Sequence, residues 1–218
     1  MAISGFALFL FVIAHMLGNL QVFLGAEQIN RYGHFLQSTP ELLWPARIGL
    51  LVLVLVHIFA AIKLSQENKA ARPVAYHNYQ MVAASYASRT MLMSGLIVLA
   101  FIIYHLLHYT AQVQYVNFTG QNFVDFTDPQ KRHDVYKMMV VGFSKPLVSL
   151  FYIVGVGLLC LHLSHGVSSM FQSLGWKNKY YGQFLDKFAR IISWVIFLGY
   201  VSIPVSVLAG FLKEAVKP

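Results

Sequence analysis

Five long stretches of this chain contain no Asp, Glu, Lys or Arg, and no other feature constrains the fold as strongly. They are residues 1–26, 48–62, 90–124, 146–176 and 191–212. A helix needs about 20 consecutive apolar residues to cross the hydrocarbon core of a bilayer. The sequence therefore predicts an all-α membrane protein with five transmembrane helices, in a single membrane domain that covers residues 1–218. The expected helices are approximately 2–24, 45–65, 88–112, 146–172 and 190–212.

The composition supports this prediction and excludes several classes of protein. Only 11% of the 218 residues are charged, against about 25% in a typical soluble domain. The single Cys excludes a disulfide framework, an iron–sulfur cluster and a Cys-rich zinc site within the chain. The net charge of +8 comes from basic residues that flank the apolar stretches, which is typical of membrane-flanking charge rather than of a nucleic-acid-binding surface.

The basic residues do not by themselves fix the orientation in the membrane. The loops after the second and fourth predicted helices together contain eight Lys and Arg, and the segments on the opposite side also contain eight. The positive-inside rule counts only Lys and Arg, so the two sides are tied. We expect the N-terminus to lie inside, which makes residues 112–145 an outer loop.

Each of the first four uncharged stretches contains at least one histidine, and the fifth contains none. These histidines are His15, His57, His105, His108, His162 and His165. A single His can simply hydrogen-bond to a neighbouring helix. A polar side chain in hydrocarbon is costly, however, and histidines in four consecutive helices indicate a function. Neutral imidazole is a common metal ligand and binds haem iron as an axial ligand.

Depth along the helices indicates which histidines can meet. With a rise of about 1.5 Å per residue, His15 and His105 lie about 13 Å and 10 Å below the expected outer helix ends. His57 and His162 lie about 20 Å and 24 Å below them. The four histidines therefore form two levels, which predicts two bis-histidine sites stacked across the membrane. Spacing alone does not decide between His105 and His108, or between His162 and His165, because each pair shares one helix face.

A Ser-Gly pair precedes two of these histidines at the same spacing. Ser4-Gly5 stands before His15 and Ser94-Gly95 before His105, and each Gly lies ten residues before its His. Ten residues correspond to about 15 Å along a helix, so both glycines fall near the inner level, where a flat macrocycle could approach the backbone. The alternative is ordinary packing of small residues between membrane helices.

These motifs resemble a known family, the five-helix dihaem cytochrome b membrane anchor of succinate dehydrogenase and fumarate reductase. The similarity covers almost the whole chain, although the loop at 112–145 is long for the family. The motifs that carry it are Ser4-Gly5-x9-His15 with Asn19, Gly25-Ala26-Glu27 followed by His34-Phe35 and Pro40, His57, Ser94-Gly95-x9-His105, and His162-Leu-Ser-His-Gly166 followed by Gly175.

The resemblance implies two b haems and one axial histidine from each of the first four helices, which form a haem-binding four-helix bundle. The expected iron ligands are His15, His57, His105 and His162, paired as His15 with His105 and His57 with His162. The Ser-Gly spacing selects His105 over His108, and the run to Gly166 and Gly175 selects His162 over His165. Gly5 and Gly95 are expected in the haem environment.

The resemblance also implies partners and a location. The chain would anchor a flavoprotein and an iron–sulfur subunit on the cytoplasmic side of a prokaryotic cytoplasmic membrane and exchange electrons with a membrane quinone, for which menaquinone is expected. It would act as a subunit of the enzyme without carrying the dicarboxylate chemistry, because it has no flavin fingerprint and no cluster cysteines.

Four further residues are candidates for roles around the haems. Ser88 and Arg89 stand before the third helix and are expected near an inner-haem propionate; Arg89 as a positive-inside anchor is the alternative. Glu27 and His34 are expected to handle protons at an outer quinone site, because quinone reduction takes up protons and the spans offer no carboxylate. A helix-capping Glu, a solvated loop His and an inner quinone site are the alternatives.

Two other functions have to be weighed. A dihaem cytochrome b that anchors another quinone-linked dehydrogenase, such as a hydrogenase or formate dehydrogenase, would show the same histidines with different partner subunits. A transporter or channel is a candidate from another class. The uncharged spans contain neither carboxylates nor basic residues for ion coupling, and no repeat of broken helices is evident, so the sequence favours a cytochrome.

Overall fold

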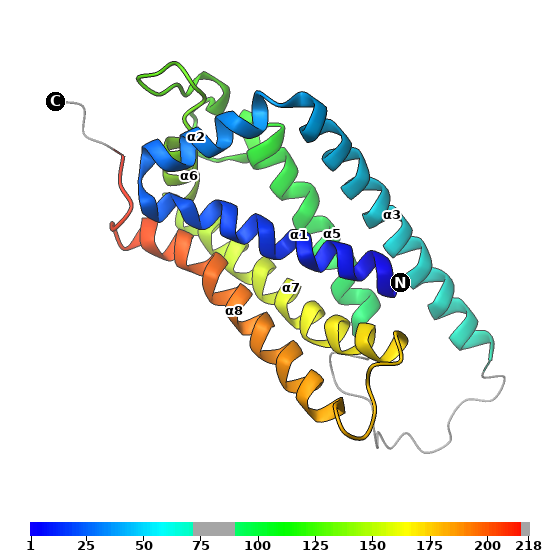
Figure 1. Ribbon diagram of the computed structural model, residues 1–218. Helices are drawn as coiled ribbons and strands as arrows, with labels where there is room; N and C mark the ends of the chain where they lie inside the picture. The colour runs from blue at the N-terminus through cyan, green and yellow to red at the C-terminus, as the bar shows by residue number, and fades with distance from the viewer. Residues whose placement is uncertain (72–89, 215–218) are drawn as a thin grey trace.

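The computed structural model describes residues 1–71 and 90–214, which are helical apart from turns, loops and one isolated β-bridge. The long helices are α1 (Ala2–Leu20), α3 (Pro40–Ala70), α5 (Met91–His105), α7 (Pro146–Ser173) and α8 (Gly182–Leu208). The shorter helices are α2 (Ala26–Gln37) and α6 (Val135–Phe143). Single 3-10 turns occur at Gln21–Leu24, Gln114–Val116 and Phe123–Asp125, and a π-helical turn at Leu106–Thr110 extends α5. Figure 1 shows the long helices side by side.

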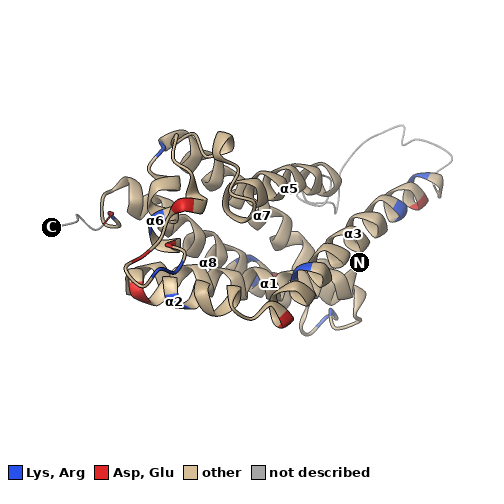
Figure 2. Cartoon of the chain, turned by 90° about the horizontal axis from the view of Figure 1, so that it is seen from above, with Lys and Arg blue, Asp and Glu red and all other residues tan. Residues whose placement is uncertain are grey.

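Five helical segments in the described part of the chain are long and apolar enough to cross a membrane. They are Ala2–Leu24, Pro40–Ala70, Met91–Thr110, Pro146–Ser173 and Gly182–Leu208. Figure 2 shows long stretches of helix without charge, with Lys, Arg, Asp and Glu near the helix ends and in the connections. The prediction of an all-α membrane protein with five transmembrane helices is confirmed.

The helix ends depart from the predicted bounds where charge was taken as the limit of a helix. The second predicted helix, 45–65, is α3, which begins at Pro40 and continues to Ala70. Proline fits the first turn of a helix because its missing N–H has no intrahelical partner there. Lys63 and Glu67 lie one turn apart on α3, with Nζ and Oε1 separated by 3.9 Å, so the helix continues through charged residues into the polar zone.

The fifth predicted helix, 190–212, is displaced toward the N-terminus. Helix α8 begins at Gly182, so the charged residues before the apolar stretch already belong to it, and it ends at Leu208. Gly210 follows with a φ of +75°, a left-handed conformation that a helix does not continue through.

Helix α7 lies at the centre of the bundle and packs against α1, α5 and α8 (Figure 1). Its buried side chains form one hydrophobic core with residues of these neighbours. Glycines permit close approach of the helices: a Cβ at Gly155 of α7 would collide with the ring of Phe101 on α5, and a Cβ at Gly199 of α8 would collide with Met16 on α1. Helix α3, which is described along its whole length, has no buried residue, so most of its apolar surface is left for lipid.

Two glycines of the family-like stretches turn the chain at helix ends. Gly25 joins the turn after α1 to α2 with a φ of +98°, and Gly175 follows α7 with a φ of +77°. Glycine adopts these angles without the steric cost that a Cβ brings. At the end of α7, the amide of Trp176 donates to the carbonyl of Phe171 at 3.0 Å, which closes the last turn. A backbone requirement therefore accounts for both residues.

The long connection between α5 and α7 folds against α2 at one end of the bundle. The Nδ2 of Asn30 donates to Oδ1 of Asp134 at 3.0 Å, and its Oδ1 accepts from the backbone amide of Tyr136 at 2.9 Å. Asn30 is buried, so these bonds fasten α6 to α2 in a site closed to water. The predicted outer loop, 112–145, is thus a folded cap that contains α6 and two short turns.

Candidate functional site

The four histidines selected above lie on α1, α3, α5 and α7 and approach one another in two pairs. The ring centres of His15 and His105 are 5.8 Å apart, with the ring planes at 79°. The ring centres of His57 and His162 are 6.5 Å apart, with the planes at 64°. All four side chains are only partly buried. The structure therefore brings together the same histidines that depth along the helices pairs.

The spacing within each pair fits one metal ion between two imidazole rings. A metal–nitrogen bond of about 2 Å places a coordinating imidazole's centre about 3 Å from the metal, so two opposite ligands have centres about 6 Å apart. Among the described residues, no group of three or more His, Cys, Asp or Glu side chains could hold a metal ion. An ion between two histidines would take its remaining ligands from water or from a cofactor, and the macrocycle of haem has four nitrogens that can fill these positions.

The hydroxyl of Ser4 fixes the orientation of His57. Its Oγ donates to the backbone carbonyl of Met1 at 3.0 Å and lies 3.2 Å from Nδ1 of His57. Because the hydroxyl has one proton and that proton is engaged, its oxygen accepts a hydrogen bond from Nδ1–H. His57 then keeps the lone pair of Nε2 free for a ligand bond, and metal-binding histidines usually donate their other ring N–H in this way.

Ser94 and His162 repeat this arrangement on the other two helices. The Oγ of Ser94 donates to the carbonyl of Met91 at 3.1 Å and lies 3.2 Å from Nδ1 of His162. The glycine after each serine lies beside the same ring. A Cβ at Gly5 would lie 3.3 Å from Cε1 of His57, and one at Gly95 would lie 3.5 Å from Cε1 of His162. The Ser-Gly pairs therefore provide both a hydrogen bond and room for each imidazole.

The other pair has different hydrogen-bonding partners. The side-chain Nδ2 of Asn19 lies 3.3 Å from both ring nitrogens of His15, which stands one turn earlier on the same helix. The Nδ1 of His105 lies 3.4 Å from the hydroxyl of Tyr152 on α7. All four paired histidines thus have a polar side chain next to the ring.

The structure also separates the histidines that residue spacing left equivalent. His108 is completely buried, its ring lies 4.1 Å from that of Tyr109, and its Nδ1 is 3.0 Å from the hydroxyl of Tyr152. The Nε2 of His165 lies 3.0 Å from the hydroxyl of Ser169 on its own helix. His105 and His162 are therefore the members of each couple that face a histidine of another helix.

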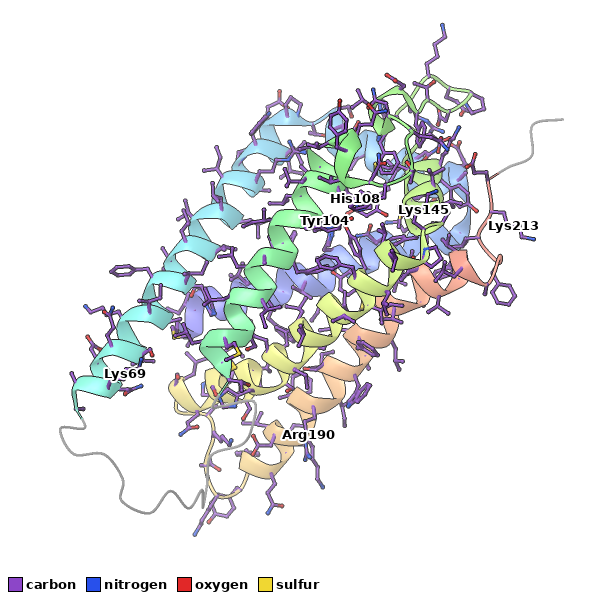
Figure 3. The ribbon with its side chains drawn as sticks, turned by 180° about the vertical axis from the view of Figure 1, so that it is seen from behind. Lys69, Tyr104, His108, Lys145, Arg190 and Lys213 are labelled. Carbon is purple, nitrogen blue, oxygen red and sulfur yellow. The ribbon has the colours of Figure 1, made fainter. Side chains whose placement is uncertain are left out.

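The two histidine pairs are well separated along the bundle. On α1, Gly5 contacts His57, and His15 stands ten residues later. On α5, Gly95 contacts His162, and His105 also stands ten residues later. Ten helical residues span about 15 Å. The His15–His105 pair lies toward the cap at residues 112–145, the end at which Figure 3 shows Tyr104, His108 and Lys145, with Lys69 and Arg190 at the opposite end.

Glu27 is held in an ion pair at the cap. Its carboxylate accepts hydrogen bonds from both terminal nitrogens of Arg132, at 3.1 and 2.6 Å. The same guanidinium donates from Nε to Asp128 at 2.7 Å. The hydrogen bond from Arg132 holds the pKa of Glu27 below its usual value, so the carboxylate stays ionised near neutral pH. These contacts describe a clamp between α2 and the cap.

The remaining predicted site residues are less informative. His34 is exposed near the end of α2. Ser88 and Arg89 lie outside the described residues. Sequence reasoning missed Tyr152, and it noticed Ser4 and Ser94 without assigning them a role. Their signal was present in part, since both serines precede a glycine at the same distance from a histidine, whereas nothing near Tyr152 in the sequence indicates its neighbours on α5.

Comparisons with known proteins add no family to this geometry. No family model, no curated protein and no solved structure matches the chain. The functional interpretation therefore depends on the histidine pairs, on their hydrogen-bonding partners and on the resemblance of the sequence motifs.

Proposed function

We propose that this chain is a membrane-embedded dihaem cytochrome b that carries electrons across the bilayer. The observation that carries the proposal is a duplicated arrangement, in which the Oγ of a Ser on one long helix lies 3.2 Å from Nδ1 of a His on another, and the two histidines face each other with ring centres 6.5 Å apart. A ring that merely fills space in a membrane core has no need of a fixed tautomer or of a facing imidazole. A metal-ligating His almost always donates its other ring N–H, and a bis-histidine metal site needs two facing imidazoles.

In this function, each residue of the two sites has a definite task. His57 and His162 would hold one haem, and His15 and His105 would hold the other. Ser4 and Ser94 keep the Nε2 lone pairs of their histidines directed at the metal position. When bound, each haem supplies a carrier that gains and loses one electron. The apolar helices around the pairs keep water from the sites, and two stations about 15 Å apart divide the roughly 30 Å of hydrocarbon into shorter transfers.

We also propose the physiological setting that the motifs resemble. The chain would anchor the flavoprotein and iron–sulfur subunits of a succinate dehydrogenase or fumarate reductase on the cytoplasmic side of a prokaryotic cytoplasmic membrane. Its N-terminus would lie inside and the cap at residues 112–145 outside. The single Cys supports the division of labour, because iron–sulfur clusters are held mainly by Cys thiolates and must therefore reside on a partner.

Quinone, with menaquinone expected, would react near the His15–His105 site. Glu27 and His34 remain the predicted proton-handling residues, and the ion pair with Arg132 makes the role of Glu27 testable. If Glu27 moves protons, Glu27→Gln lowers quinone-reductase activity while Arg132→Gln leaves most of it. If Glu27 only clamps the cap, both variants lower activity to a similar extent. His34→Ala tests the histidine separately, because its exposed side chain can be removed with little effect on folding.

The proposed function is tested on the complex purified from native membranes. A pyridine haemochrome assay should find two b haems per chain, and a redox titration in the visible region should resolve two components. The subunits that co-purify should include a flavoprotein and an iron–sulfur protein. A chain without haem would refute the proposal. Two haems together with hydrogenase or formate dehydrogenase subunits would retain the cytochrome and replace the proposed enzyme.

The predicted propionate partners require a separate measurement. Arg89→Gln should shift the midpoint potential of the haem held by His57 and His162. The guanidinium would partly neutralise an anionic propionate, and the charge next to the haem affects the stability of the oxidised iron. An unchanged potential would favour Arg89 as a positive-inside anchor of its helix.

A further inference from the structure

We infer that Tyr152 is a positioning residue for His105, and that His108 holds the hydroxyl of Tyr152 in place. This inference depends on the proposed function, because it gives His105 the role of an iron ligand. It goes beyond that function by assigning a task to two buried residues that bind no haem in the proposed scheme.

The hydroxyl of Tyr152 stands between two histidines that are one helical turn apart. Its oxygen lies 3.4 Å from Nδ1 of His105 and 3.0 Å from Nδ1 of His108. Tyr152 is 6% exposed and His108 is 0% exposed, so bulk water does not compete for these groups. The three side chains therefore form one hydrogen-bonded chain that connects α5 to α7.

The single proton of the hydroxyl fixes the direction of this chain. When His105 binds metal through Nε2, its Nδ1 carries a proton and donates to the oxygen of Tyr152. The hydroxyl then donates its own proton to Nδ1 of His108, which must be unprotonated. His108 is thereby fixed as the tautomer that carries its proton on Nε2.

This tautomer places an N–H at a buried position of His108. Its Nε2 is buried and has no hydrogen-bond partner among the described residues. The hydrogen bond between Nδ1 of His108 and Tyr152 therefore has to offset the cost of a buried N–H without a partner. The rings of Tyr104, Tyr109 and Phe123 surround the imidazole at centre distances of 5.5, 4.1 and 5.6 Å and hold it in this position.

The hydrogen bonds of Tyr152 also make the His15–His105 site different from the His57–His162 site. The serines beside His57 and His162 donate to a backbone carbonyl, whereas Tyr152 donates to a second imidazole. An acceptor for the Nδ1 proton raises the basicity of a ligating imidazole and stabilises the oxidised metal. Removal of the hydroxyl should therefore make the haem at this site easier to reduce.

The test is Tyr152→Phe in the purified complex. We expect both haems to remain, the reduction equilibrium of the His15–His105 haem to shift about tenfold toward the reduced form, or about 59 mV for one electron, and its EPR g-values to change. The other haem should be unchanged. Tyr104→Phe is the matched control, because its hydroxyl donates at 2.9 Å to the carbonyl of Val116 outside the chain of hydrogen bonds. Unaltered g-values and potential in Tyr152→Phe would overturn the inference.

Substitution of His108 distinguishes positioning from simple packing. His108→Asn retains an acceptor close to the place of Nδ1 and should preserve the potential, whereas His108→Leu removes the acceptor and should shift it in the same direction as Tyr152→Phe. Equal shifts in the Asn and Leu variants would show that only the volume of the ring matters, which would overturn the role of His108.

The hydrogen bonds can also be measured without haem. In haem-loaded protein labelled with ¹⁵N-histidine, His108 should be the Nε2–H tautomer and His105 should carry its proton on Nδ1. With or without haem, Tyr152→Phe should alter the signals of both histidines, while Tyr104→Phe alters neither. If the protein binds no haem and shows this result, the proposed function is refuted, whereas the hydrogen bonds between His105, Tyr152 and His108 are retained. A haem-loaded protein with His108 protonated on Nδ1 would retain the function and overturn the inference.

Discussion

Ser4 of α1 and His57 of α3 are separated by 53 residues in the sequence, yet Oγ and Nδ1 lie 3.2 Å apart, and Ser94 and His162 repeat the same contact on α5 and α7. In each case, the hydroxyl of a serine near the start of one long helix contacts the ring of a histidine on the following long helix. The proton that the serine accepts fixes the tautomer, and the glycine beside it leaves room for the ring. The same serine–histidine contact therefore occurs once between α1 and α3 and once between α5 and α7.

The pairing of histidines predicts which haem each substitution removes. His15→Ala or His105→Ala should abolish the haem nearer the cap, and His57→Ala or His162→Ala the haem nearer the opposite end, as resolved by redox titration. His165→Ala is the matched control and should keep both haems, because its Nε2 is bonded within its own helix. Loss of the same haem from the His15 and His57 variants would contradict the pairing.

The serines should tune the haem held by His57 and His162. Ser4→Ala or Ser94→Ala removes the acceptor of an Nδ1 proton, which lowers ligand basicity and should raise the midpoint potential of this haem. A net hydrogen bond is worth about 0.5–1.5 kcal/mol, which corresponds to a rise of roughly 20–60 mV. Ser193→Ala is the control, because Ser193 donates to the carbonyl of Ala189 on α8 in the same manner. Equal shifts in Ser4→Ala and Ser193→Ala would contradict the prediction.

The glycines should respond in the order of their distances. Gly5→Ala places a Cβ 3.3 Å from the ring of His57, closer than ordinary contact, whereas Gly95→Ala places one 3.5 Å from the ring of His162. We expect Gly5→Ala to change the EPR spectrum of the haem held by His57 and His162 more than Gly95→Ala does. Gly49→Ala on α3 meets nothing within 4 Å and should leave the spectrum unchanged while favouring the helix by up to about 1 kcal/mol. The reverse order would show that the rings lie elsewhere.

The ion pairs at the cap predict a dependence on pH. The hydrogen bond from Arg132 lowers the pKa of Glu27. Burial acts to raise the pKa of Asp128, but the hydrogen bonds and the charge of Arg132 together outweigh burial and lower it. A carboxyl whose pKa is lowered by folding stabilises the fold above its unfolded pKa of about 4, and this contribution is lost as the pH falls through the folded pKa. Protection of residues 111–134 from hydrogen exchange should stay constant from pH 7 to 5 and fall below about pH 4.

Arg132→Gln supplies the control for this pH dependence. Without the guanidinium, protection of the cap should already be low at pH 7 and should change little on acidification. A variant that keeps the full acid response of the wild type would show that other carboxyl groups hold the cap.

Helix ends illustrate what the sequence could and could not predict about the fold. The five apolar stretches predict five spans because the cost of charge in hydrocarbon depends only on local composition. The predicted ends of α3 and α8 were wrong by several residues, because a helix continues past the membrane surface as long as its backbone hydrogen bonds and side-chain pairs permit. Helix α6 was not expected at all, since its attachment to Asn30 involves a residue more than 100 positions away.

The sequence by itself determined that histidines stand at two levels in four membrane helices, because the rise per residue converts position into depth. Residue spacing left His105 and His108, and His162 and His165, equivalent, and only the resemblance to a family chose between them; the tertiary structure shows that His105 and His162 face a histidine of another helix. Depth is a property of one helix, whereas the direction in which a side chain points depends on how that helix is rotated against its neighbours. That rotation is set by contacts such as Phe101 against Gly155 and Met16 against Gly199, which join residues distant in the sequence.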